Sequence, residues 1–303
     1  MHDFTRRTSL LSVLALAACQ VSERHGPVEA NDDRGLFFFG HVREVEARVG
    51  GRVGVAALNT ADGFVLSHRA NERFAMCSMF KWLLAAQMLY IDMHAPGYRD
   101  QSIPFGARDL EGLGHTPVTR ANLARGSMTV EELARAAVVQ SDNGAANLLM
   151  AGAGGPEGLT RFLQSNGDAD TRLDRIEPEL NQNLPGDERD TTTPSAMVNT
   201  MNRFLLSDAV LNQSSRERLI SWLVECETGL DRLRGGLPAD WRAGDKTGTS
   251  DSEHNATTDV AIAWPPGRAP IIIACFLSDS TIDFAERKAA HAEIARYTVE
   301  GMS

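Results

Sequence analysis

The start of the folded part is predicted from a helical pattern followed by two strand patterns. Residues 36–49 place apolar side chains at helical spacing, and two β-rich runs follow at residues 52–60 and 64–68. Ala61-Asp62-Gly63 joins these runs, and an Asp-Gly pair between such runs is a strong signal for a β-hairpin. The pattern therefore predicts one helix and one antiparallel pair of strands.

A long helix-rich middle separates this hairpin from three further strands. Residues 78–92 are almost continuously apolar after their first turn, which predicts a buried helix. Apolar spacing and capping residues predict further helices at residues 129–140, 142–150, 158–166, 194–206, 214–225 and 284–301. Strands are predicted at residues 241–249, 257–264 and 271–277.

Strands at both ends of the chain with helices between them predict an α+β fold. We expect an antiparallel five-stranded sheet flanked by helices, with an all-α lobe inserted in its sequence. The expected boundaries are residues 36–70 and 232–303 for the α/β lobe and residues 71–231 for the all-α lobe.

Residues 1–19 predict an export signal. Arg6-Arg7 precede an apolar run at residues 10–18, which is too short to span a bilayer but suits a signal peptide. The sequence Leu-Ala-Ala-Cys ending at Cys19 resembles a bacterial lipobox, and the paired arginines resemble a twin-arginine signal. An ordinary secretory signal is the alternative. We expect an exported, periplasmic protein, with a lipid anchor at Cys19 as its membrane attachment and residues 20–35 as a flexible tether.

Composition and charge exclude several classes of protein. The 303 residues are 43% hydrophobic and 23% charged, which is ordinary for a globular protein and excludes collagen-like and largely disordered chains. A formal net charge of −10 repels phosphate backbones, and no local basic patch offsets it. We therefore expect no nucleic-acid partner, and we expect a monomer.

Cysteine and histidine positions limit the covalent and metal chemistry. Removal of the leader leaves Cys77, Cys226 and Cys275, an odd number that cannot all pair within the chain. We expect no intramolecular disulfide, with all three as small buried residues. The eight histidines include no close pair and no His-Glu-x-x-His, so no metal site and no cofactor are predicted.

Ser78 and Lys81 are the first candidate catalytic pair. The spacing of three residues at the start of a helix places both side chains on one face, within reach of a hydrogen bond. A serine needs a neighbouring base to become a nucleophile, and a desolvated lysine can have a lowered pKa. Ser-x-x-Lys alone is nevertheless a common sequence.

Two more short motifs strengthen this interpretation. Ser141-Asp142-Asn143 lies between two predicted helices, where capping is the simplest explanation for these residue types. Lys246-Thr247-Gly248-Thr249 lies in a predicted strand, where a glycine allows another backbone or a ligand to approach closely. Each motif is weak evidence alone, but the ordered trio is specific.

This trio resembles the signature of class A serine β-lactamases and penicillin-binding proteins. The resemblance to class A covers residues 35–301 and includes the loop Arg175-Ile176-Glu177-Pro178-Glu179-Leu180-Asn181, which is similar to the family's Arg-x-Glu-x-x-Leu-Asn. Asp190 stands where the family has the aspartate that pairs with the loop arginine. Residues 264–271 resemble the carbapenem-hydrolysing branch.

The resemblance implies a role for each catalytic residue. Ser78 would attack the lactam carbonyl, and either Lys81 or Glu177 acting through a water would take the serine proton. Ser141 would pass a proton to the departing nitrogen. The backbone N–H groups of Ser78 and Thr249 would form the oxyanion hole.

The resemblance also implies substrate-binding residues. Asn143 would hold the substrate's side-chain amide, and Lys246 with Thr247 would bind its carboxylate. Glu177 and Asn181 would position and activate the water that hydrolyses the ester.

The chain departs from the family pattern at three places. Thr258 occupies the strand position where many relatives carry an arginine for the substrate carboxylate, and we expect Arg232 to replace it. His115 stands where the family has an aromatic gate residue, although a plain surface-loop histidine is an equal alternative. Cys77 precedes the nucleophile as in some carbapenemases, but no cysteine follows Lys-Thr-Gly to bridge it.

The resemblance implies hydrolysis of β-lactam antibiotics, with these small molecules as the partners. A penicillin-binding D,D-peptidase shares the three motifs, but Glu177 in its loop argues against that alternative because it supplies a deacylating base. A non-catalytic lipoprotein that binds the cell wall is a second alternative. Buried polar residues without a function would be costly to keep together, which disfavours it.

Overall fold

A computed structural model describes residues 33–250 and 252–303. The predicted signal peptide, the lipidation of Cys19 and residues 20–32 of the predicted tether lie outside the described residues. The tether prediction is wrong at its end, because helix α1 (Asp33–Val49) already includes residues 33–35 and buries Gly35. Within the two described ranges, no helix is long and apolar enough to cross a membrane.

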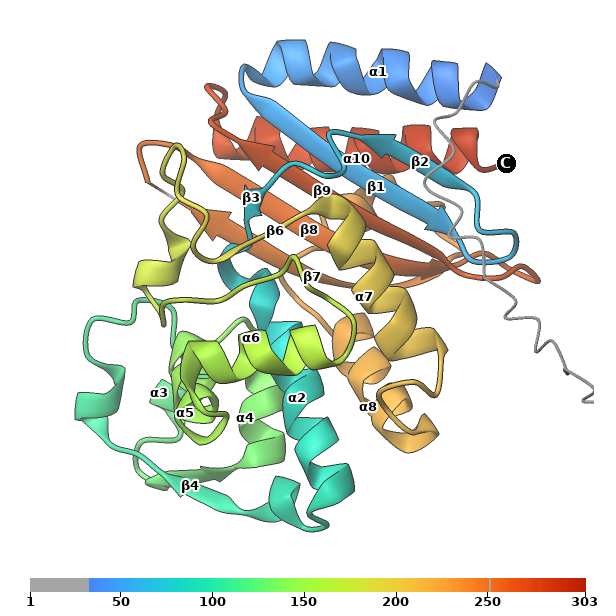
Figure 1. Ribbon diagram of the computed structural model, residues 1–303. Helices are drawn as coiled ribbons and strands as arrows, with labels where there is room; N and C mark the ends of the chain where they lie inside the picture. Colours follow the sequence, from blue (N-terminus) through green and yellow to red (C-terminus); the bar gives the residue numbers. More distant parts are fainter. Residues whose placement is uncertain (1–32, 251) are drawn as a thin grey trace, which may run out of the picture.

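A five-stranded antiparallel sheet forms one layer of the molecule, with the strand order β2-β1-β9-β8-β7 (Figure 1). Its strands are β1 (Arg52–Asn59), β2 (Val65–His68), β7 (Arg242–Ser250), β8 (Ala256–Trp264) and β9 (Ile271–Ser278). The hairpin of β1 and β2 is confirmed, and β1 pairs on its other side with β9, where Arg52 lies opposite Ser278. The predicted α+β class and antiparallel sheet are therefore confirmed.

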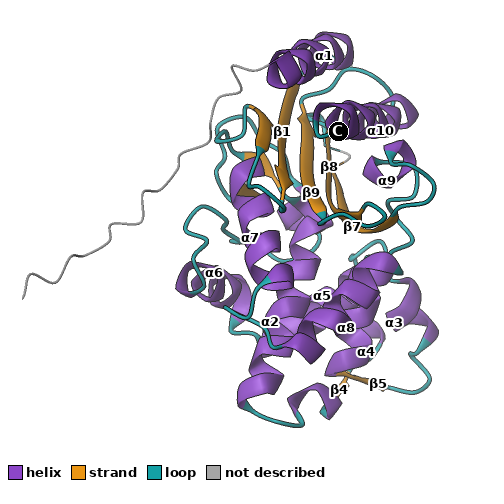
Figure 2. Cartoon of the chain, turned by 90° about the vertical axis from the view of Figure 1, so that its right-hand side faces the viewer, coloured by secondary structure: helices purple, strands orange, loops and turns teal. Residues whose placement is uncertain are grey.

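Each face of the sheet has its own hydrophobic core because successive side chains of a strand point to opposite faces. Val53 and Val55 of β1 pack with Phe38 of α1 and Ile294 of α10 (Phe284–Gly301) in one core. Ala56 and Leu58, the alternate positions, belong to the core shared with the helical middle of the chain. Helices α1 and α10 thus cover one face, and the helical middle covers the other (Figure 2).

Helix α2 (Phe80–His94) is the central helix of this middle part. Residues 80–89 are all buried, as their almost continuous apolar sequence predicts. The surrounding helices are α3 (Pro117–Ala121), α4 (Val130–Val139), α5 (Asn143–Gly152), α6 (Gly155–Ser165), α7 (Pro194–Leu206) and α8 (Gln213–Val224). The short helix α9 (Leu233–Gly236) lies instead beside α10 on the other face of the sheet, where Leu233 joins the core of α1 and α10 (Figure 2).

Several short elements were not predicted. Two small ladders pair β3 (Phe74–Ala75) with β6 (Thr191–Thr192) and β4 (Ser102–Pro104) with β5 (Ser127–Thr129). Short 3₁₀ helices are η1 (Cys77–Met79), η2 (Tyr98–Asp100), η3 (Ala107–Leu110) and η4 (Glu179–Asn181). Two of these, η1 and η4, lie in the segments that carry the predicted catalytic residues.

Candidate active site

Ser78 and Lys81 lie where η1 runs directly into α2. Ser78 is in the 3₁₀ turn rather than in the α-helix, and the preceding Cys77 has a left-handed backbone with φ of 48°. Lys81 is fully buried, and its Nζ donates to Ser78 Oγ at 2.8 Å. The predicted hydrogen bond between the two side chains is confirmed.

Lys81 also connects Ser78 to two other segments. Its Nζ donates to the Ser141 carbonyl oxygen at 2.8 Å and to Asn143 Oδ1 at 2.5 Å, and it lies 2.9 Å from Glu177 Oε1. Burial lowers the pKa of Lys81 below its ordinary value, although the Glu177 carboxylate opposes that shift. A lysine with a lowered pKa is better able to accept a proton from Ser78.

Within Ser141-Asp142-Asn143, Asp142 caps a helix and Ser141 lies in the candidate site. Asp142 is the N-cap of α5 and accepts a hydrogen bond from the backbone N–H of Ala145 at 2.8 Å, so the capping prediction is confirmed for this residue. Ser141 has a left-handed backbone with φ of 56°. The Ser141 Oγ lies 3.5 Å from Lys81 Nζ, so the Ser141 hydroxyl is close to the Ser78–Lys81 pair.

Strand β7 brings Lys246 to the same place. Lys246 is buried, and its Nζ donates to Ser141 Oγ at 3.1 Å. Burial, opposed by Cys226 and assisted by the nearby Lys81, lowers the pKa of Lys246 to about 8. A side chain at Gly248 would clash with the backbone oxygen of Met76, so the glycine lets β7 pack against η1.

Glu177 approaches the nucleophile from the loop of residues 171–190. Its Oε1 lies 3.2 Å from Ser78 Oγ, and Asn181 donates to its other oxygen at 2.5 Å. The carboxylate therefore has one oxygen directed to Ser78 and Lys81 and the other held by the loop's own amide. Ser78 Oγ donates directly to this carboxylate, so the same oxygen is placed to accept a proton close to the nucleophile.

Arg175 and Asn147 both help to hold the loop that carries Glu177. Arg175 pairs with the buried Asp190, as the resemblance predicts. Asn147, on α5, accepts from the Glu177 backbone N–H at 3.0 Å and donates to its carbonyl oxygen at 2.9 Å. This role of Asn147 could not be predicted from its local sequence, since an asparagine within a helix has no distinctive local pattern.

Arg232 contacts strand β7 at Gly248 and Thr249, next to Lys246 and Thr247. Its guanidinium is buried and donates to the Gly248 carbonyl oxygen at 2.7 Å and to Thr249 Oγ1 at 2.7 Å. Burial lowers the pKa of Arg232 from its ordinary value. Thr228, which the sequence analysis missed, lies with its Oγ1 2.7 Å from Thr247 Oγ1.

His115 is exposed beside the Ser141-Asp142-Asn143 segment. Its Nε2 lies 2.9 Å from the Gln140 carbonyl oxygen, and its own carbonyl oxygen accepts from the Asn143 backbone N–H at 2.8 Å. These contacts are compatible with both a gate residue and a surface-loop histidine, so the role of His115 stays a prediction.

The three cysteines and the carboxylates serve no metal centre in the described ranges. Cys77, Cys226 and Cys275 are buried thiols. Residues 33–250 and 252–303 contain no group of three histidine, cysteine or acidic side chains placed to hold a metal ion.

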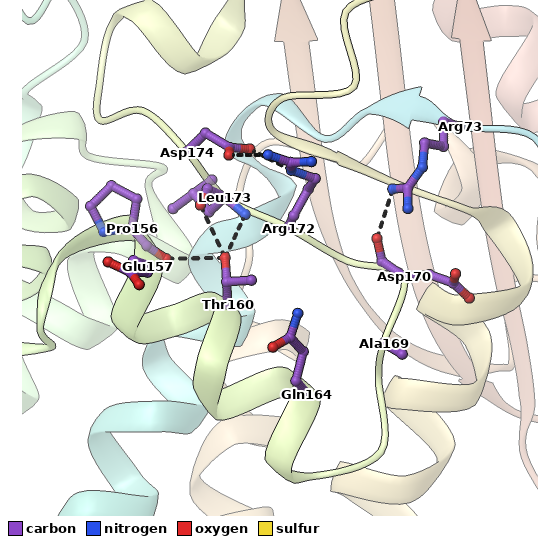
Figure 3. Close-up of a pocket in the computed structure, with 10 residues that line it drawn as sticks. All are labelled: Arg73, Pro156, Glu157, Thr160, Gln164, Ala169, Asp170, Arg172, Leu173 and Asp174. Carbon is purple, nitrogen blue, oxygen red and sulfur yellow. Dashed lines mark hydrogen bonds and ion pairs between the residues drawn. The ribbon is translucent and has the colours of Figure 1, made fainter.

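A separate cavity of about 570 Å³ is lined by the first residues of the 171–190 loop and by helix α6 (Figure 3). Among its lining residues, Arg172 donates to the Asp174 carboxylate at 2.9 Å, and Arg73 donates to the Asp170 backbone carbonyl oxygen at 2.7 Å. None of the predicted site residues lines this cavity.

A family model and individual relatives both match this chain to β-lactamases. Residues 40–301 match the model of the β-lactamase enzyme family. Over 259 residues the chain is 46% identical to β-lactamase AST-1 of Nocardia asteroides, covering 86% of this chain and 82% of the relative. It is 42% identical to the carbapenem-hydrolysing β-lactamase KPC of Klebsiella oxytoca, covering 86% of this chain and 87% of the relative.

Solved structures agree with the sequence relatives. The reconstructed class A β-lactamase of the last common ancestor of Gram-negative bacteria superposes with a TM-score of 0.84 at 50% identity, covering 88% of this chain and 99% of that chain. A β-lactamase from Xanthomonas campestris superposes with a TM-score of 0.84 at 42% identity, covering 89% and 99%. The chain belongs to the β-lactamase enzyme family and, within it, to the class A serine β-lactamases.

Proposed function

We propose that this β-lactamase opens its substrate through a covalent ester on Ser78. Ser78 Oγ bonds to the lactam carbonyl carbon, the carbon–nitrogen bond breaks, and the nitrogen takes a proton. A water then adds to the ester carbon, which releases the ring-opened acid and returns the proton to Ser78. The main support for this proposal is that Ser78 Oγ lies 2.8 Å from Lys81 Nζ and 3.2 Å from Glu177 Oε1.

The surrounding contacts support the other roles. Ser141 Oγ lies 3.1 Å from Lys246 Nζ, which suits a hydroxyl that passes a proton to the departing nitrogen. Lys246, Thr247 and the nearby Arg232 supply cation and hydroxyl groups for the substrate carboxylate. Asn143 would bind the substrate's side-chain amide.

The backbone N–H groups of Ser78 and Thr249 would form the oxyanion hole. The pairing of Asn181 with Glu177, at 2.5 Å, supports the deacylating water over the penicillin-binding alternative. Family membership disfavours that alternative and the non-catalytic lipoprotein equally.

The test is rapid mixing of the chain lacking residues 1–19 with a chromogenic cephalosporin. We expect many turnovers per enzyme, and a covalent adduct that mass spectrometry finds on the wild type but not on Ser78→Ala. A rate loss of roughly 10⁴-fold or more is expected for that variant. A single burst followed by silence with a cephalosporin, a penicillin and a carbapenem alike would overturn the proposal.

We propose further that the enzyme acts outside the cytoplasm, with Cys19 lipidated. The proposal rests on Arg6-Arg7, the apolar run at residues 10–18 and the lipobox-like sequence ending at Cys19. Radiolabelled palmitate should enter the wild type and not Cys19→Ser, and absence of label from both would remove the lipid anchor.

A further inference from the structure

Asn183 joins the loop of residues 171–190 to the five-stranded sheet. The Asn183 side chain is only 8% exposed, and its Nδ2 donates both to the His254 carbonyl oxygen and, at 2.9 Å, to Ser278 Oγ. Throughout the described ranges, these two are the hydrogen bonds that tie this loop to the sheet and its turns. A buried amide with both of its N–H groups engaged is a specific contact rather than incidental packing.

The acceptors of Asn183 are themselves held in a small network. Ser278, at the end of β9, donates through Oγ to Asp279 Oδ2 at 2.8 Å, and His254 Nδ1 lies 3.0 Å from Asp279 Oδ1. The backbone N–H of Asp279 donates to the Asn255 carbonyl oxygen at 2.9 Å. The turn between β7 and β8 and the end of β9 therefore form one framework, and Asn183 attaches the loop to it.

The distance along the chain from Asn183 to the reacting groups is short. Asn181, which donates to Glu177, closes the 3₁₀ helix η4, and Asn183 follows two residues later. Asn147 holds the Glu177 backbone from the side of α5. Asn183 attaches the same segment to the sheet, so a shift at Asn183 is expected to move Asn181 and the Glu177 carboxylate to which Asn181 donates.

We infer that Asn183 is a positioning residue for deacylation, because it fixes the Glu177–Asn181 pair relative to β7 and Ser78. The inference rests on the proposed role of Glu177 in the hydrolysis of the ester. With Lys81 as the base for acylation, attack on the lactam by Ser78 relies on Lys81 and Lys246, which come from elements other than the loop. Loss of the Asn183 contacts therefore slows the second half of the reaction more than the first.

The experiment measures both half-reactions in variants of the full chain. For Asn183→Ala we expect the deacylation rate constant to fall roughly tenfold or more, since small misplacements of a catalytic group have large effects on rate. The acylation rate constant should stay within about twofold, so that the acyl-enzyme accumulates. Asn183→Leu, which fills a similar volume without an amide, should behave in the same way.

Two further variants separate positioning from general stability. Ser278→Ala removes one acceptor and should give a smaller loss of the same kind, and its combination with Asn183→Ala should cost less than the sum of the two. Asn166→Ala deletes an amide that donates at 2.8 Å to the Phe162 carbonyl oxygen on α6, and both rate constants should remain those of the wild type.

Unchanged deacylation in Asn183→Ala, normal deacylation in Asn183→Leu, or equal slowing of both half-reactions would overturn the inference. A wild type that forms no acyl-enzyme would instead overturn the proposed function.

Discussion

The Ser78 hydroxyl lies between two groups that differ in charge. Lys81 Nζ donates to its Oγ at 2.8 Å, and Glu177 Oε1 lies 3.2 Å from the same atom. The amine and the carboxylate are 2.9 Å apart and fully buried, so each stabilises a charge that the protein interior would otherwise disfavour. Removal of one of them is therefore expected to change the two halves of the reaction differently.

Glu177→Ala tests this separation. The variant should still form some acyl-enzyme, because Lys81 remains beside Ser78, but it should retain the ester because no base activates the water. Mass spectrometry after mixing with a penicillin should find the adduct, and steady-state turnover should be lost. The control is Glu179→Ala, which removes an exposed carboxylate from the same loop and should turn over normally. Fast turnover by Glu177→Ala would contradict the assignment.

The pKa of Lys246, lowered to about 8 by burial, predicts the alkaline limb of the pH profile. Below pH 8 the free enzyme presents an ammonium to the substrate carboxylate, and above it this charge is lost, so kcat/KM should fall as the pH rises through about 8. Lys246→Arg keeps its charge and should move this limb to higher pH. An unchanged limb in that variant would assign it to another group.

The same shift has a consequence for stability with the opposite sign. The ordinary pKa of lysine is 10.5, so between about pH 8 and 10.5 the unfolded chain binds a proton at Lys246 that the folded chain has lost. The contribution of this residue to the free energy of unfolding therefore increases with pH across that window.

Sequence spacing could predict contacts between residues that are close along the chain. Ser78 and Lys81 are one helical turn apart, and their hydrogen bond follows from that spacing. The convergence of Ser141, Glu177 and Lys246 on this pair could be expected only from the family resemblance, because nothing local encodes contacts between distant segments. The same reason explains why Asn147 was missed.

At the scale of elements, the reactive groups depend on a helix that cannot easily shift. Helix α2 is buried over residues 80–89 and begins directly after η1, which carries Ser78. Close packing around the helix transmits any change in its position to the start of the site. The rigidity of the nucleophile is therefore a property of the core and not only of the site.

Leu83→Ala is expected to destabilise the protein by about 2–5 kcal/mol, since it leaves a cavity in the core around α2. Leu83 is 0% exposed, whereas Leu36, on α1, is 61% exposed. Leu36→Ala is thus a matched control that should change the free energy of unfolding by less than about 0.5 kcal/mol. Urea unfolding measures both, and similar values for the two variants would contradict the expected dependence on burial.

Long periodic segments were predicted well and short ones were not. The five strands of the sheet and the buried helix at residues 80–89 follow from their own apolar patterns. Each strand of the β3–β6 ladder has only two residues, and its formation depends on Phe74 meeting Thr192 from a distant part of the chain. Helix α1 begins at Asp33, earlier than expected, and buries Gly35, a contact that the polar sequence around it does not reveal.

For the whole molecule, the predicted division into two lobes does not divide the hydrophobic core. One core contains Leu83 of α2 and Leu133 of α4 together with Leu58 of β1 and Phe276 of β9. The helical middle therefore shares its core with one face of the sheet and does not keep that core without it, while α1 and α10 cover the other face.

A single cooperative unfolding transition is expected in consequence. Trp82 reports on α2, and Trp264 reports on the end of β8. Two variants are needed, each with only one of these tryptophans left in the chain. In each variant, fluorescence should give the same urea midpoint as far-ultraviolet circular dichroism of that variant. A fluorescence midpoint that differs from the circular-dichroism midpoint of the same variant would show that the lobes unfold independently.

The strand order has a consequence for synthesis of the chain. Strand β1 is among the first elements to leave the ribosome, but its neighbour β9 is made near the end, and Lys246 on β7 is also late. A nascent chain that ends at residue 240 holds most of its helices, an open edge on β1 and no Lys246. Such a chain offers its unpaired edge to other chains until the last strands emerge. The sheet and the reactive site therefore both stay incomplete until strands β7 and β9 have been made.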